Sequence, residues 1–426
     1  MKFLLHILTI LAFTGMLQAQ KTFIQCGTLI DCTSEETKKA VTIVVENNLI
    51  TSVVDGYVGS KEEGMVIDLK NQTVMPGLMD MHVHIEGQTG SASYAEKFRL
   101  NSADVALRST IYAKKTLMAG FTSVRDMGGT GVNVSLRDAI NKGYVDGPRI
   151  FTAEKSLAST GGHADPSNGV RKELMGDPGP AEGVVNSVED AKKAVRQRYK
   201  NGADCIKITA TGGVTSVSKN ASGPHFTIEE IEAIVQTAKD YNFHVAAHAH
   251  GPEGMKRAVL AGVTTIEHGT MMTTEIMDLM IEKGTYLVPT IGAGKYAASK
   301  VNTPGFYPDI IIPKILEVVA FIDKTYPEAF KRGVKVAFGT DAGVSPHGEN
   351  AKEFEFMVAA GMDPMKAILS ATVVPASILN VSDKMGTIEV GKYADIVSVP
   401  GNPLEDISLM SKVEFVMKDG VIYKKP

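Results

Sequence analysis

Hydrophobic and polar residues alternate in repeating blocks along most of this chain. Between Gly120 and Asp341 a short β-branched run is followed by a polar or glycine-containing loop and then by an amphipathic stretch of about 10 to 15 residues. The runs fall at residues 121–124, 149–152, 205–209, 244–248, 264–268, 286–290 and 336–341, and an earlier apolar run at 74–84 makes eight. Strands that alternate with helices indicate an α/β fold. Eight repeats predict a (β/α)8 TIM barrel, whose active site lies at the carboxyl ends of the strands.

The stretches between these runs have the pattern of helices. Thr227 and Glu230 stand three residues apart at the start of one stretch, as in a capping box. Apolar residues then recur at helical spacing, at Ile228, Ile231, Ile234, Val235 and Ala238. We therefore expect an amphipathic helix to begin at this box.

The two ends of the chain have a different texture. Asn47-Asn48 separates two β-branched runs near the N-terminus, and Lys418-Asp419-Gly420 follows another run near the C-terminus. Turn residues beside such runs predict β-hairpins. We expect a small β-sandwich domain built from residues 20–73 plus 387–426, with the barrel in residues 74–386.

Residues 1–19 have the pattern of a secretory signal peptide. Lys2 precedes an apolar stretch from Phe3 to Leu17, and a small residue, Ala19, stands where cleavage would occur. The stretch is too short to span a bilayer. We therefore expect an exported protein, periplasmic or secreted, without stable membrane insertion.

Composition narrows the classes of function. The 426 residues are 44% hydrophobic and 22% charged with a net charge of −4, which is ordinary for a globular protein. There is no strongly basic field to attract nucleic acid. The three cysteines do not form a disulfide framework, and their scarcity argues against a structural thiolate site. The expected partner is a small-molecule or dipeptide substrate, and the sequence leaves open whether the chain forms a homo-oligomer.

Candidate metal ligands stand at four of the predicted strand ends. His82 and His84 close the first strand, where alternate residues point the same way. His248, His268 and Asp341 close the fifth, sixth and eighth strands. Imidazole nitrogens and a carboxylate that converge on one point suit zinc or another divalent first-row metal.

Lys207, within the fourth strand, admits two interpretations. An ammonium has no lone pair and would repel a cation, so this residue could be a partly buried lysine paired with Asp341 or Asp204. Alternatively, burial and nearby metal depress the pKa of its amine, which then takes up carbon dioxide and becomes a carbamate, an anionic oxygen ligand that bridges two metals. The residues alone leave both interpretations open.

Seven segments together resemble one protein family. They are VMPGLMDMHVH (74–84), TGGHAD (160–165), IKITATGG (206–213), AHAHG (247–251), IEHG (266–269), GTDAG (339–343) and GTIEVGKYAD (386–395). Over residues 20–426 the chain resembles the amidohydrolase superfamily, and within it the imidazolonepropionase-related and Xaa-Pro dipeptidase (prolidase)-like branch.

The resemblance implies a binuclear metal centre. The implied ligands are His82, His84 and Asp341 for one metal and His248 and His268 for the other, with carboxylated Lys207 as the bridge. The metal would be zinc, with manganese, cobalt or iron as other choices. Two such cations lower the pKa of a bridging water so that hydroxide forms near neutral pH, and Asp341 would serve as general base and then general acid.

The resemblance also implies how the substrate is held. His163 follows a Gly-Gly turn after the third strand, and His250 lies two residues past His248. In dipeptidase-like relatives these places face the terminal carboxylate of the substrate, so we assign both histidines to carboxylate binding. The alternative for each is a hydrogen bond to a metal ligand or a position in a surface loop. Relatives often have tyrosine at the place of His250.

The predicted function is that of an exported binuclear metal-dependent amidohydrolase. Its substrate would be a small molecule with an amide bond and a carboxylate, such as a dipeptide, an Xaa-Pro dipeptide or an N-acyl amino acid. A lactonase or phosphotriesterase would use the same metal centre. A cyclic amidine or imidazolone hydrolase is disfavoured by Lys207, and a non-catalytic binding protein by the retention of Asp341.

Overall fold

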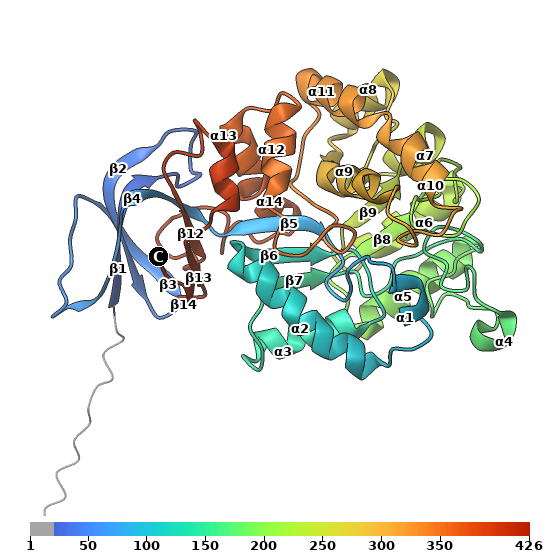
Figure 1. Ribbon diagram of the computed structural model, residues 1–426, viewed down its shortest axis with the longest axis horizontal. Helices are drawn as coiled ribbons and strands as arrows, with labels where there is room; N and C mark the ends of the chain where they lie inside the picture. Colours follow the sequence, from blue (N-terminus) through green and yellow to red (C-terminus); the bar gives the residue numbers. More distant parts are fainter. Residues whose placement is uncertain (1–20) are drawn as a thin grey trace, which may run out of the picture.

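The computed structural model describes residues 21–426, so the predicted signal peptide at 1–19 lies outside the described residues and export stays a prediction. The two ends of the described chain share one seven-stranded sheet, which lies beside a larger α/β body (Figure 1). In spatial order its strands are β14 (Val421–Lys424), β13 (Phe415–Lys418), β12 (Ile396–Pro400), β4 (Gly64–Pro76), β1 (Lys21–Leu29), β2 (Lys38–Glu46) and β3 (Leu49–Asp55).

Both predicted hairpins are present in this terminal sheet. β2 and β3 pair antiparallel across Asn47-Asn48, and β13 and β14 pair antiparallel across Asp419-Gly420. Asp419 and Gly420 both have positive φ, at 50° and 74°, as a tight two-residue hairpin turn requires.

The predicted two-sheet sandwich is not confirmed. β4 pairs in parallel with β1 on one side and antiparallel with β12 on the other, so hydrogen bonding runs without a break from the N-terminal to the C-terminal strands. The described residues therefore form one continuous sheet here, and β4 carries the chain directly from it into the α/β body.

The parallel strands of the α/β body fall into two sheets. One has the order β5 (Leu78–Val83), β6 (Phe121–Asp126) and β7 (Arg149–Thr152). The other has the order β11 (Tyr286–Val288), β10 (Thr265–His268), β9 (Val245–Ala249) and β8 (Ile206–Thr209). These are seven of the eight predicted strands, in the predicted sequence order.

The eighth predicted run, residues 336–341, is not assigned as a strand. Its backbone still lies between the two sheets. Ala337 N donates to Leu287 O of β11 at 2.9 Å, and Asp341 N donates to His82 O of β5 at 2.7 Å. Val336 and Ala342 form only isolated bridges, to Leu287 and Val83, and Asp341 between them leaves extended geometry with a φ of 56°.

Leu157 makes a similar connection between β7 and β8, the other edge strands of the two sheets. Its N–H donates to Lys207 O at 2.8 Å, and its carbonyl accepts from Thr209 N at 2.9 Å, next to the end of β7. The arrangement is TIM-barrel-like, with strands whose carboxyl ends face the same side.

Helices surround these strands (Figure 1). Their bounds are α1 (Ser93–Glu96), α2 (Ser102–Met118), α3 (Val132–Asn141), α4 (Lys172–Met175), α5 (Val188–Asn201), α6 (Ile228–Lys239), α7 (Pro252–Leu260), α8 (Thr274–Lys283), α9 (Ile291–Lys300), α10 (Ile312–Val319), α11 (Ile322–Arg332), α12 (Lys352–Ala359), α13 (Pro364–Ser370) and α14 (Val373–Ile378), followed by the 3-10 helix η1 (Ile407–Ser411). The predicted capping box is confirmed at the start of α6, where Thr227 Oγ1 accepts from Glu230 N.

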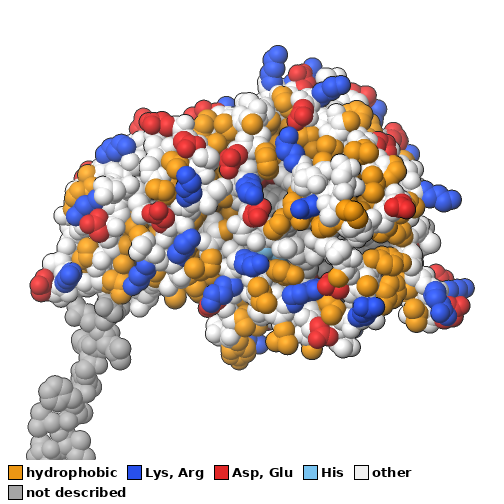
Figure 2. All heavy atoms as spheres, viewed as in Figure 1, with side chains coloured by type: hydrophobic (Ala, Val, Ile, Leu, Met, Phe, Trp, Pro, Cys, Tyr) orange, Lys and Arg blue, Asp and Glu red, His pale blue; other side chains and the backbone are white. Residues whose placement is uncertain are grey.

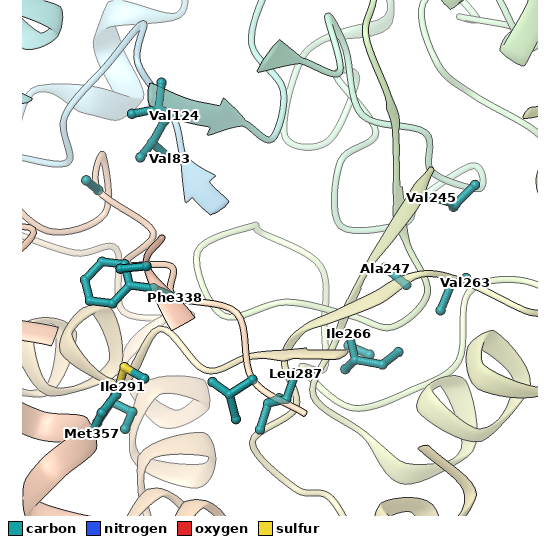
Figure 3. Packing of buried hydrophobic residues seen from close by; sticks show 14 of the residues in the cluster. Val83, Val124, Val245, Ala247, Val263, Ile266, Leu287, Ile291, Phe338 and Met357 are labelled. Atoms are coloured by element: carbon teal, nitrogen blue, oxygen red, sulfur yellow. The ribbon is translucent and has the colours of Figure 1, made fainter. Parts of the chain in front are cut away.

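Alternation along the strands decides which residues form the core. Ile206 and Ile208 of β8 belong to the large apolar cluster between strands and helices, as do Ile266 and Leu287 of neighbouring strands (Figure 3). The residue between the first pair, Lys207, therefore points to the other side of the sheet, into the barrel. Cys205 packs there in a separate small cluster.

The distribution of charged side chains on the surface fits the sequence, which predicts no strongly basic region. Figure 2 shows acidic and basic side chains interspersed over one face of the molecule. Within residues 21–426, no helix has the length and apolar character needed to cross a membrane. Cys26, Cys32 and Cys205 are all buried free thiols, as expected.

Candidate metal centre

All eight residues predicted for the site line one cavity of about 540 Å³. The cavity lies at the carboxyl ends of the parallel strands, where the fold places active sites. The eight are His82, His84, His163, Lys207, His248, His250, His268 and Asp341. They come from segments far apart in the sequence, and only the strand arrangement brings them together.

Asp341 is the point at which three of these side chains meet. Its Oδ1 lies 3.5 Å from Nε2 of His82 and 3.5 Å from Nε2 of His84. This oxygen is buried and has no hydrogen-bond partner among the described residues. One ligand atom each from His82, His268 and Asp341 lie within 4.8 Å of one another. A buried oxygen without a donor, beside imidazole nitrogens, fits a metal ligand.

The first two histidines each use Nδ1 for a hydrogen bond and leave Nε2 free. Nδ1 of His82 lies 2.7 Å from Oε2 of Glu267, and Nδ1 of His84 lies 2.7 Å from the carbonyl oxygen of Gly128. A carbonyl or carboxylate oxygen only accepts, so Nδ1 carries the proton in both rings. The Nε2 lone pairs then point toward Asp341. Metal-binding histidines are usually fixed in this way.

The other two histidines differ in which nitrogen is free. Nδ1 of His268 is 2.7 Å from Oγ1 of Thr290, which leaves Nε2. In His248 it is Nε2 that donates to the carbonyl oxygen of Gly212, at 2.9 Å, which leaves Nδ1. The His248 and His268 rings lie 4.7 Å apart between centroids, so both can serve one cation.

Lys207 lies at the centre of the cluster. Its Nζ is 3.5 Å from Nε2 of His82, and the side chain is buried. The interpretation as a partner of Asp204 is wrong, because that carboxylate binds Arg137 at 2.8 Å. Lys207 makes no ion pair with Asp341 either, within the described part of the chain. Burial lowers the pKa of Lys207 to about 8, although Glu267 and Asp341 oppose the shift.

Burial also sets the charge of the other groups. It lowers the pKa of His82, His248 and His268 well below the usual value, which keeps these imidazoles neutral and able to donate a lone pair. Burial raises the pKa of Asp341 to about 6. Neutral imidazoles and a carboxylate are the donor set expected for a divalent first-row metal.

The backbone is strained at this cluster. His268 has a φ of 70°, Thr290 a φ of 50° and Asp341 a φ of 56°, although none is glycine. Such conformations cost of order 1–3 kcal/mol each and concentrate at functional sites, where surrounding structure enforces them. The strained positions coincide with two of the predicted ligands and with the hydrogen-bond partner of one of them.

His163 and His250 line the same cavity and stack on two of the predicted ligands. The His163 ring stacks on His248 at 4.4 Å, and the His250 ring stacks on His268 at 5.0 Å. Nδ1 of His250 is 3.0 Å from Oγ1 of Thr270, which leaves Nε2 free. Burial lowers the pKa of His250 to about 3, so its ring is neutral.

Sequence reasoning missed a buried ion pair behind His82. Glu267 Oε1 binds Arg125 Nη2 at 2.8 Å, while its Oε2 holds His82. Both charged side chains have no exposed surface. The available signal was a pair of charged residues inside runs that had to be buried, at Thr265-Ile266-Glu267-His268 and at Val124-Arg125.

Known proteins place this site in a family. The Amidohydrolase family matches residues 73–423. The chain belongs to the Amidohydrolase family. A Xaa-Pro dipeptidase crystallised with bound methionine in its active site is 51% identical, covers 95% of this chain and 100% of its own, and superposes with a TM-score of 0.92.

Two named proteins are also similar to this chain in sequence. Ochratoxinase from Aspergillus niger is 31% identical over 96% of this chain and 88% of its own length. An imidazolonepropionase from Fusobacterium nucleatum is 24% identical over 83% of each chain. The predicted branch of the family is thus confirmed. This chain is a metal-dependent hydrolase of amide or peptide C–N bonds, with a TIM-barrel-like α/β fold.

Proposed function

We propose that this protein hydrolyses the amide bond of a small substrate that carries a carboxylate, such as a dipeptide, an Xaa-Pro dipeptide or an N-acyl amino acid. The observation that carries the proposal is the convergence on Asp341. Its buried Oδ1 lies 3.5 Å from Nε2 of both His82 and His84, with no donor among residues 21–426 to satisfy it.

Two divalent cations fit the free lone pairs of this cluster. Nε2 of His82 and His84 with Asp341 would hold one cation, Nδ1 of His248 and Nε2 of His268 would hold the other, and a carboxylated Lys207 would add anionic oxygens to the site. An ammonium at Lys207 would repel both cations, whereas a carbamate supplies anionic oxygens. Its buried place, 3.5 Å from Nε2 of His82, supports this role. Zinc suits such a donor set.

Bound divalent cations supply Lewis acidity and lower the pKa of water at the site. The protein's own contribution to proton transfer comes from Asp341. Its carboxylate takes a proton from the attacking water and delivers that proton to the nitrogen of the leaving amine. The place of Asp341 among the imidazoles, with Oδ1 buried and without a donor in the described chain, supports this role.

His163 and His250 are proposed to bind the substrate carboxylate. Both histidines line the cavity beside predicted metal ligands, and Nε2 of His250 is left free by the bond to Thr270. Two neutral imidazoles can each donate one hydrogen bond to a carboxylate oxygen. The 51% identical dipeptidase binds methionine, an amino acid with a free carboxylate, which supports this class of substrate.

The broader architecture belongs to the same proposal. We infer that the two parallel sheets and residues 336–341 act as one (β/α)8 barrel domain at 74–386. The terminal segments, residues 20–73 and 387–426, would be a separate domain built on the seven-stranded sheet. Export to the periplasm or medium is proposed from residues 1–19. The mature protein would then begin at Gln20, after cleavage behind Ala19.

A hydrolysis screen tests the function. The zinc- or manganese-loaded protein is offered dipeptides, Xaa-Pro dipeptides and N-acyl amino acids, together with a lactone and a phosphotriester. We expect turnover of carboxylate-bearing amides and at least tenfold less for the corresponding amino acid amides, which lack the carboxylate. Turnover of lactones or phosphotriesters without any carboxylate-bearing amide would show the proposal to be wrong.

A further inference from the structure

A lysine without an acidic partner is buried close to the candidate metal centre. Lys314 lies on α10, and only 4% of its surface is exposed. The next residue, Ile315, lines the cavity. Within the described part of the chain, burial is what acts on the charge of Lys314, and no carboxylate offsets it. Burying an ammonium is costly unless hydrogen bonds replace its hydration. The hydrogen-bond partners of Lys314 therefore show what its burial achieves.

The Lys314 ammonium donates to three backbone carbonyl groups of one loop. Nζ lies 3.2 Å from the carbonyl oxygen of Gly213 and 3.0 Å from that of Ser218, and it also donates to that of Ser216. An ammonium has three N–H donors, so this set uses all of them. The acceptors lie within residues 213–218, which follow β8 and which we call the post-β8 loop. Three carbonyl groups of this loop thus converge on one charge.

The post-β8 loop has no other polar attachment of its backbone. Among residues 21–426, the backbone of this loop makes no further hydrogen bond with another segment. Gly212, just before the loop, is held separately, because its N–H donates to the carbonyl oxygen of Gly223 at 2.9 Å. Val214 and Thr215 of the loop line the cavity. Lys314 is therefore the polar anchor of a loop that faces the cavity.

The same loop supports the ring of His163. A Cβ on Gly213 would lie 2.2, 2.3 and 2.4 Å from Nδ1, Cε1 and Cγ of that ring, so glycine permits the backbone to approach this closely. The similar distances place Gly213 over the face of the ring. A displaced loop would leave His163 less firmly held. His248 would keep its own partner, since Nε2 donates to the carbonyl oxygen of the separately held Gly212 at 2.9 Å.

We infer that Lys314 is a positioning residue for the substrate carboxylate: it anchors the post-β8 loop, and the loop holds His163 in place to bind the carboxylate. The inference rests on the proposed function and adds a residue that does not itself line the cavity. Without the anchor, substrate binding would have to order the loop, and this entropy cost weakens binding. Lys314 should therefore affect substrate affinity and leave the metal ligands in place.

The test uses Lys314→Met, which keeps a long side chain and removes the three donors. For the zinc-loaded variant acting on N-acetyl-methionine, we expect KM to rise about tenfold and kcat to change by less than about threefold. N-acetyl-methioninamide has no carboxylate, so kcat/KM for its deacetylation should change by less than about twofold. Zinc content per chain should equal that of the natural protein. Calorimetry on the product, methionine, should show a loss of affinity of about tenfold without any turnover.

A double variant tests whether Lys314 acts through His163. His163→Phe keeps a ring but cannot donate a hydrogen bond to the carboxylate. The double variant His163→Phe with Lys314→Met should have a KM within about twofold of that of His163→Phe alone, because residues that act through one contact are not additive. Two losses that multiply would show that Lys314 acts independently of His163 and would overturn the inference.

Lys418→Met is the matched control. It removes another largely buried ammonium, which pairs with Asp419 in the terminal sheet and does not line the cavity. KM for N-acetyl-methionine should stay as in the natural protein. Thermal unfolding identifies a variant that fails to fold. If Lys314→Met fails, Lys314→Gln takes its place, since the amide retains a donor for the loop carbonyl groups, and a smaller rise in KM is expected.

Three results would overturn the role given to Lys314. They are an unchanged KM, equal losses for N-acetyl-methionine and its amide, and a loss of zinc from the variant. Each of them leaves the proposed function intact. If the natural protein hydrolyses neither N-acyl amino acids nor dipeptides, the proposed function is refuted instead, and the affinity for methionine then decides on Lys314.

Discussion

Glu267 holds His82 through a 2.7 Å contact between its Oε2 and Nδ1 of the ring. The same carboxylate binds Arg125 through its other oxygen at 2.8 Å, and Arg125 Nε donates to the carbonyl oxygen of Met81, the residue before His82. Glu267 therefore fixes the His82 ring, and Arg125 fixes the backbone just before it. Nε2 of the ring faces Asp341. This buried chain sets the geometry of the proposed metal centre.

Glu267→Gln should weaken metal binding. The amide keeps the size of the side chain but removes the charge that favours a proton on Nδ1 of His82, and it leaves Arg125 buried without its partner. We expect zinc affinity to fall about 10- to 100-fold, measured by competition with a chelating dye. Glu154→Gln is the control, since it breaks another buried ion pair, with Arg198, and its side chain does not line the cavity. Equal zinc affinities in these two variants would contradict the role given to Glu267.

Carboxylation of Lys207 can be observed directly. In protein equilibrated with ¹³C-labelled bicarbonate and zinc, we expect a carbamate carbon resonance that is missing in Lys207→Met, together with a loss of bound metal. Lys314→Met is the matched control, because burial lowers the pKa of both lysines to about 8 but only Lys207 lies among the imidazoles. A resonance that persists in Lys207→Met, or none in the natural protein, would refute the carbamate.

Asp341→Asn should separate proton transfer from binding. The amide cannot carry a proton from water to the leaving nitrogen, so kcat for an N-acyl amino acid should fall about 100-fold or more. The ester analogue, in which an alcohol replaces the amine, depends less on protonation of the leaving group and should lose less. Steady-state kinetics on the amide and ester pair measure the difference. Equal losses on both would indicate that Asp341 acts only as a ligand.

The sequence predicts those features that depend on residues close together along the chain better than those that depend on distant ones. Strand and helix positions follow from alternation that is local, and the strand ends then place His82, His84, His248 and His268 correctly. The neighbour of β4 is not local, since its partner β12 lies more than 300 residues later, and one continuous sheet replaced the expected sandwich. The eighth predicted strand is not assigned because the run makes only isolated bridges, at Val336 and at Ala342 just beyond it, although its backbone still bonds to both sheets.

The buried polar residues were harder to interpret than the ligands. Glu267 lies in a predicted strand and Arg125 directly follows one, but only the fold shows that the two pair inside the barrel with no exposed surface. The free nitrogen of His248 likewise depends on a carbonyl, that of Gly212, which no sequence pattern identifies. Partners that meet only in the folded chain therefore require the structure.

Away from the site, Asp31 should make stability depend on pH. Burial alone would raise the pKa of Asp31, but hydrogen bonds from Lys38 and Thr33 outweigh burial and lower it below the usual 3.8. A folded-state pKa below the unfolded value stabilises the protein above that unfolded value, and this contribution is lost as pH falls through the folded pKa. The loss of stability in Asp31→Asn should therefore be full at pH 6 and shrink at acid pH, in thermal unfolding measured across that range. A difference that grows toward low pH would contradict the assignment.

The number of metal ions per active chain is the most direct test of the central claim. Metal content by plasma mass spectrometry is measured alongside turnover of an N-acyl amino acid, after chelation and stepwise return of zinc. The account predicts no turnover in the chelated protein and full recovery as two zinc ions bind each chain. Turnover that survives complete removal of metal, or full activity with a single ion, would contradict it.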